Sequence, residues 1–279
     1  ATTPTTVPPR LLSRAMAASS TGSQASVIVG PAIGDLPMVL GVEVVYAAST
    51  VLCVVAMLLV ARLRMVPRKV VSRGASLDDV FAGVRFIAQR PIILGAILLD
   101  LFAVLFGGAI ALLPIYAREI LEGGPGMLGW LRAAPAVGAL AMSLYLMRHP
   151  PSTRVGLKLL LSVAVFGLAT ITFGLSKLFW LSMLALMVNG AADMVSVVIR
   201  QTLVQLETPD EMRGRVSAVN SVFIGASNQL GEFQSGAAAT LVGPVAAVVL
   251  GGSATCLLAL LWRRFFPQLA RRQRLDPRA

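Results

Sequence analysis

The chain has 279 residues, of which 56% are hydrophobic and 13% charged, with a net charge of +11 and a mean hydropathy of +0.80. A soluble domain of this size needs a more polar surface than these proportions provide, so they exclude that class. The excess of Lys and Arg would suggest nucleic-acid binding in a soluble chain. In a membrane protein it follows from the enrichment of basic residues in cytoplasmic loops. We therefore expect a lipid bilayer, and no nucleic acid, around this chain.

Eight apolar segments are long enough to span a bilayer as helices. None alternates apolar and polar residues at the period of two that a barrel strand requires. The first segment is rich in Ser and Gln, so we expect it to face other helices or a wet cavity rather than lipid. The sequence therefore predicts an all-α membrane protein, a multi-pass bundle of about eight transmembrane helices. They are expected at residues 12–34, 41–63, 92–117, 126–147, 155–175, 178–206, 215–240 and 243–265.

The basic residues alternate between the two sides of these spans. Of the 24 Lys and Arg residues, all but Arg118, Arg132 and Lys177 fall in connections that would share one side. Lys and Arg beside a span mark its cytoplasmic end. This predicts a multi-pass protein of the bacterial inner membrane with both termini in the cytoplasm.

The longest polar interval, residues 64–90, separates two spans from six. Within it an apolar face recurs at helical spacing after Ser76, an expected N-cap, and before Pro91, an expected stop. The face consists of Leu77, Val80, Phe81, Val84 and Ile87. The pattern predicts an amphipathic helix along the cytoplasmic membrane face, and favours a linker over catalysis by the adjacent Asp78 and Asp79.

These features predict four parts. Residues 1–63 would hold the last two spans of an N-terminal bundle, and 64–90 a cytoplasmic loop with its amphipathic helix. Residues 91–265 would form a six-span C-terminal bundle, and 266–279 a basic cytoplasmic tail. Transporters are often built from six-helix halves. We therefore expect an incomplete N-terminal half, with four spans supplied by a missing segment or a partner chain.

Two short patterns interrupt this apolar background. "IVGPAIGD" places Gly30, Pro31 and Gly34 within the first expected span, where small residues allow close helix approach and proline bends the helix. "PDEMRGR", from Pro209 to Arg215, lies between two spans and has the form P-x-x-x-R-G-R. Ordinary glycine packing stays open as an alternative explanation of the first pattern.

Both patterns resemble those of the major facilitator superfamily, and residues 193–236, which contain the second pattern, resemble the bacterial exporter branch that includes the enterobactin exporter. Drug and metabolite antiporters of that superfamily carry G-P-x-x-G-G in the fifth span, after two earlier glycines. Here Asp35, Ala17 and Ser26 depart from that pattern. The resemblance implies spans five to twelve of a twelve-span exporter. It also implies that the R-G-R loop, with Arg213 and Arg215, lies at a cytoplasmic gate.

Ionisable residues inside spans are costly and are therefore candidates for function. Asp100, Asp193 and Glu232 fall inside expected spans, and Asn228 lies one turn from Glu232 on the same face. One interpretation is that Glu232 or Asp100 binds the exchanged proton, with Asp193 a further candidate. The alternative is a carboxyl group hydrogen-bonded between helices for packing.

Arg200 lies two helical turns after Asp193 on the same face, too far for a direct pair without long side-chain reach. Two interpretations stay open for Arg200. It either closes a cytoplasmic latch on a carboxylate or snorkels at a helix end. The carboxylate would belong to another helix or to the following connection, which holds Glu207, Asp210 and Glu211.

These patterns together favour a secondary transporter that exports a small organic molecule by proton antiport and alternating access. The resemblance implies a siderophore, drug or metabolite as substrate. A proton-linked importer and an inactive transporter fragment stay open as alternatives. A membrane enzyme fits poorly, because the aspartates are not clustered around a possible metal-bound diphosphate. No G-x-x-x-x-G-K-[ST] loop is present, and the chain has one histidine, so we expect neither a cofactor nor a metal.

Overall fold

A computed structural model describes residues 42–62, 77–123, 125–149, 151 and 153–273 of the chain. Contacts divide the chain into two compact units, residues 1–73 and 74–279, which are described separately. In the first unit, α3 (Val42–Arg62) forms where a span was expected at 41–63, with an apolar stretch at Tyr46–Leu59. The span expected at 12–34, together with Gly30, Pro31 and Gly34, lies outside the described residues.

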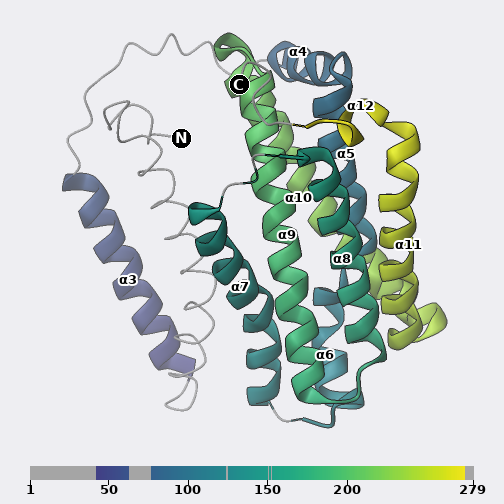
Figure 1. Cartoon of the computed structure of the whole chain (residues 1–279). Helices are drawn as coiled ribbons and strands as arrows, with labels where there is room; N and C mark the ends of the chain where they lie inside the picture. The colour runs from purple at the N-terminus through teal and green to yellow at the C-terminus, as the bar shows by residue number, and fades with distance from the viewer. Residues whose placement is uncertain (1–41, 63–76, 124, 150, 152, 274–279) are drawn as a thin grey trace. The chain divides into compact units, whose positions relative to one another are not determined.

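The second unit is a bundle of helices, and no strand occurs in its described residues (Figure 1). Its elements follow in chain order: α4 (Leu77–Ala88), α5 (Pro91–Phe106), η3 (Ala109–Leu112), α6 (Leu113–Ile115), η4 (Tyr116–Ile120), α7 (Pro125–Arg148), α8 (Val155–Leu175), α9 (Phe179–Glu207), α10 (Asp210–Val242), α11 (Pro244–Phe265) and α12 (Pro267–Ala270).

Five helical stretches in the described residues are long and apolar enough to cross a membrane. They are Pro91–Ile120, Gly126–Arg148, Val155–Leu175, Phe179–Glu207 and Pro244–Phe265. Each coincides within a few residues with an expected span, which confirms the prediction of an all-α membrane protein. The protein is therefore an integral membrane protein.

The span expected at 215–240 forms α10, but α10 is not among these five stretches because polar residues recur along it. It packs against α4, α5 and α11, so it belongs to the bundle. Its membrane crossing stays a prediction.

Glycines allow a close crossing of α7 and α9. A Cβ atom built on Gly138 would overlap the backbone carbonyl of Met187, and one on Gly190 would overlap that of Pro135. These two glycines therefore bring the backbones together, and van der Waals contact between the helices stabilises the crossing.

The amphipathic helix expected before Pro91 forms as α4, and it packs against α10 through one edge of the expected apolar face. Gly83 and Ile87 are buried, and Ile87 packs with Val216 and Val219 of α10. Phe81 and Val84, which were grouped with Ile87, are exposed. The apolar arc is wider than the contact with α10, so only one edge of it is covered. Pro91 begins α5, and α4 ends three residues earlier.

The span expected as one helix at 92–117 is broken after Phe106. Gly107 ends α5, and the chain continues as a 3₁₀ turn, a short α segment and the π-helical turn η4. A Cβ atom on Gly108 would lie 2.5 Å from Ser235 Oγ and 2.9 Å from the Gly231 carbonyl oxygen of α10. Gly108 thus allows the broken segment to lie directly against α10, whereas a Cβ atom on Gly107 would overlap the Phe166 ring of α8.

Candidate functional site: a buried charge cluster

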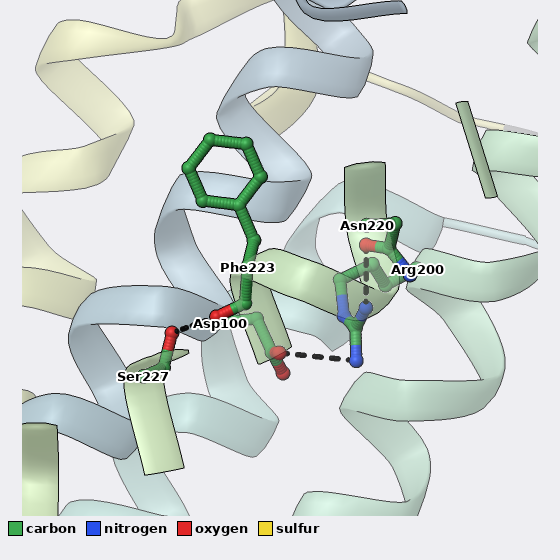
Figure 2. Close-up of polar contacts among 5 residues, drawn as sticks. All are labelled: Asp100, Arg200, Asn220, Phe223 and Ser227. Carbon is green, nitrogen blue, oxygen red and sulfur yellow. Dashed lines mark hydrogen bonds and ion pairs between the residues drawn. The ribbon is translucent and has the colours of Figure 1, made fainter. Parts of the chain in front are cut away.

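An ion pair joins α5 to α9 inside the bundle. Arg200 Nη2 lies 3.0 Å from Asp100 Oδ2, and the two side chains are 3% and 10% exposed (Figure 2). Asp100 lies within Pro91–Ile120 and Arg200 within Phe179–Glu207, two of the membrane-crossing stretches. Removing two charges from water costs several kcal/mol per ion, which only good pairing offsets. The pair therefore fixes the relative rotation of these helices.

A third helix completes the contacts of the guanidinium group. Arg200 Nη1 donates a hydrogen bond of 3.2 Å to Asn220 Oδ1 on α10 (Figure 2). The Nε atom is also buried, and its N–H has no acceptor among the described residues. Arg200 thus connects α5, α9 and α10, and its Nε–H is available for a further acceptor.

Asp193 adds a second carboxylate to this cluster. It lies two turns before Arg200 on α9, and it interacts electrostatically with both Asp100 and Arg200. Asp100, Asp193, Ser162 and Ser196 border a narrow cavity between α5, α8 and α9. The cluster therefore holds two carboxylates for one guanidinium, beside hydroxyl groups that could donate or accept hydrogen bonds.

This geometry decides between the two interpretations of Arg200. Arg200 is seven residues from the end of α9 and buried, so snorkelling at a helix end is wrong. The connection to α10 consists only of Thr208 and Pro209, and Glu207 pairs with Arg272, at 2.5 Å. Arg200 meets a carboxylate on another helix, that of Asp100.

The P-x-x-x-R-G-R pattern was expected in a loop, and the structure places most of it in a helix. Pro209 is the N-cap of α10, so Arg213 and Arg215 lie in its first two turns, where both are exposed. Arg215 Nη1 lies 3.6 Å from Met212 Sδ. Helix α10 begins earlier than the apolar pattern indicates, because its first turns are polar.

The other two candidates lie away from the cluster. Asn228 and Glu232 are exposed on α10, on the same face as Ser217 and Ser221. Their spacing of four, seven and four residues forms a polar stripe along the helix. The structure therefore separates the carboxylates into two groups, Asp100 and Asp193 inside the bundle and Glu232 on its surface.

Three residues of the cluster, Asn220, Ser162 and Ser196, were not among the predicted site residues. Asn220 could have been predicted from the sequence, because an amide within an expected span needs a hydrogen-bond partner. Ser162 and Ser196 could not, because a serine in a span is also typical of ordinary helix packing. No three His, Cys, Asp or Glu residues in the described part of the chain could hold a metal ion together. The candidate site is thus a charge and hydrogen-bond cluster.

Residues 1–277 match the family described as "Transmembrane secretion effector". The chain belongs to this family. Transmembrane secretion effectors of this kind are major facilitator proteins, as the motifs in the sequence indicated.

The chain is similar to proteins named "Enterobactin exporter EntS" from Escherichia coli APEC and Escherichia coli O81 (strain ED1a). Each is 26% identical over 251 residues, which cover 90% of this chain and 60% of the relative. The chain thus spans about 60% of the length of these curated relatives. No solved structure matches the chain.

Proposed function

We propose that this transmembrane secretion effector exports a small organic molecule in exchange for protons, by alternating access in the bacterial inner membrane. Its family and its resemblance to enterobactin exporters support export over uptake. The basic residues beside the spans support an orientation with both termini in the cytoplasm.

The observation that carries the coupling to protons is the buried cluster. Asp100 and Asp193 face a single guanidinium inside membrane-crossing helices. One uncompensated negative charge there is costly, so a proton bound to the cluster stabilises it. Release of that proton would leave Asp193 and Asp100 competing for Arg200, whose Nε donor has no acceptor among the described residues. Proton binding would thereby change how α5 and α9 are held together.

The polar stripe of α10 supports a substrate path. Asn228 and Glu232 are exposed on α10, and contact of these polar side chains with lipid would be unfavourable. We place the substrate along this stripe, and Arg213 and Arg215 at its cytoplasmic end. Siderophores are the first class to test, because the relatives are named for enterobactin.

Transport into inverted membrane vesicles tests the proposal, with enterobactin as the probe and an acidic vesicle lumen as the driving force. We expect accumulation that a protonophore abolishes. Asp193→Asn should lose gradient-driven accumulation but keep exchange of labelled for unlabelled substrate, because neutralising the cluster removes coupling without closing the path. Accumulation of the Asp193→Asn variant at the wild-type level would contradict the assignment of the proton.

Two further variants separate the roles of the carboxylates. Glu232→Gln should weaken substrate affinity while the dependence on the pH gradient persists. Glu122→Gln is the matched control, since Glu122 is an exposed carboxylate beyond η4, and it should transport like the wild type. Loss of the gradient dependence in Glu232→Gln would move the coupling site to α10.

A further inference from the structure

A second pocket lies at the end of the bundle where α8 begins and α11 ends. Its volume is about 410 Å³, and four of its lining residues are arginines: Arg154, Arg263, Arg271 and Arg272. They come from the start of α8, the last turn of α11 and the residues after α12. Because α8 and α11 both cross the membrane, their ends place this pocket at the level of the lipid headgroups.

Close backbone contacts hold the pocket together. The N–H of Gly156 donates to the Arg272 carbonyl at 3.0 Å, and a Cβ atom on Gly156 would overlap the Leu269 carbonyl. Helix α12 also contacts α5, α8 and α11. Residues 269–272 are therefore fixed against the start of α8, so the arginines they carry have a defined place beside Arg154.

The described lining of the pocket contains four arginines and no carboxylate. Arg272 pairs with Glu207 at the end of α9. Among the described residues, no carboxylate forms an ion pair with Arg154, Arg263 or Arg271, and all three side chains are exposed. Guanidinium groups that converge on one pocket suit a phosphate group, which they bind with paired, charge-assisted hydrogen bonds.

Part of the pocket wall is apolar, and it continues along α8 and α11 into the membrane-crossing surface. Leu157 and Leu160 line it, and Leu161 and Leu260 are exposed nearby on α8 and α11. A soluble anion would gain nothing from this surface, whereas an acyl chain attached to the phosphate would bury it. Basic pockets between transmembrane helices on the cytoplasmic side bind anionic lipid headgroups.

We propose that this pocket binds the phosphate headgroup of an anionic phospholipid, with Arg154, Arg263 and Arg271 as its ligands and the acyl chains along α8 and α11. The bound lipid would tie α8 and α11 to the segment that carries Arg272. Through the Arg272–Glu207 pair it would also support the end of α9.

Native mass spectrometry of the purified, lipid-depleted protein tests this proposal, with phosphatidylglycerol, phosphatidylcholine of the same acyl chains, and inorganic phosphate as probes. We expect phosphatidylglycerol to bind at least tenfold more tightly than phosphatidylcholine. Arg154→Gln/Arg263→Gln should weaken phosphatidylglycerol binding about 30-fold, the factor that two arginines near an anionic surface supply. Phosphatidylcholine binding should weaken less, because its choline cation offsets the charge of its phosphate.

The matched control is Arg85→Gln/Arg148→Gln, which removes two exposed arginines of α4 and α7 that do not line the pocket. It should bind phosphatidylglycerol within twofold of the wild type. Equal losses in both double variants would indicate diffuse charge and overturn the proposal. Competition by inorganic phosphate at equal concentration would assign the pocket to a soluble anion instead. Equal melting temperatures in lipid-free detergent verify that the variants are folded.

Discussion

Arg200 is the side chain on which the buried cluster depends. A guanidinium cannot lose its proton at physiological pH, so inside a membrane it needs a carboxylate as well as hydrogen-bond acceptors. Asp100 and Asn220 supply these contacts from two other helices, and Asp193 provides a second carboxylate nearby. The two ion-pair partners are therefore not equivalent, because Arg200 has a second carboxylate within electrostatic range and Asp100 has no second cation in the described cluster.

This asymmetry predicts the result of a double-mutant cycle. Arg200→Met should lower the free energy of unfolding by about 3 to 5 kcal/mol, because it leaves two carboxylates without a cation. Asp100→Leu should cost less, because Asp193 still compensates Arg200, and the double variant should recover part of the loss. Unfolding in mixed micelles by sodium dodecyl sulfate measures the cycle. Additive losses would show that the two residues are not coupled.

At the scale of single elements, the crossing of α7 and α9 depends on residues with no side chain. Gly190→Ala and Gly138→Ala should each destabilise the protein by about 1 to 3 kcal/mol, because the added methyl group meets backbone rather than a movable side chain. Gly225→Ala on α10 is the control, since nothing lies within 4 Å of its Cβ position, and it should leave stability equal or slightly higher. Thermal unfolding in detergent measures all three, and a neutral Gly190→Ala would disprove the close crossing.

Two exposed helix faces of the second unit differ in chemistry, and this difference predicts their surroundings. The α10 face carries Ser221 and Asn228, whereas the α11 face carries Leu257 and Leu260. In a Cys53→Ser/Cys256→Ala background, Ser221→Cys and Asn228→Cys should react with a water-soluble maleimide. Leu257→Cys and Leu260→Cys should react slowly, because thiols in lipid stay protonated and shielded. Equal labelling rates on both faces would remove the argument for a wet path along α10.

At the scale of the whole molecule, the distribution of basic residues predicts the orientation. Thr153 precedes α8 on the side rich in arginine, and Lys177 follows α8 on the opposite side. In the same cysteine-free background, Lys177→Cys should react with an impermeant maleimide in intact spheroplasts, whereas Thr153→Cys should react only after permeabilisation. The reverse pattern would invert the topology and, with it, the proposed direction of proton movement.

The sequence by itself determined the membrane class and the positions of most helices. Long apolar runs such as 155–175 and 243–265 must form helices in lipid, because every backbone N–H and C=O group needs a partner within its own segment. Charged side chains are costly in lipid, so the sequence also predicted Asp100, Asp193 and Arg200 as candidate site residues. These inferences are local, so they hold without knowledge of neighbouring helices.

Only the tertiary structure decided which of these groups meet. The pairing of Arg200 with Asp100, and of Glu207 with Arg272, depends on helix rotation and translation, which residue spacing within one helix does not contain. The same holds for α4, whose wide apolar arc did not reveal that Gly83 and Ile87 form the contact. At Gly83, Gly138 and Gly190 the backbone of a neighbouring helix lies so close that a Cβ atom would overlap the neighbouring helix. A contact of this kind is a property of two helices, and the sequence of either one alone is insufficient to predict it.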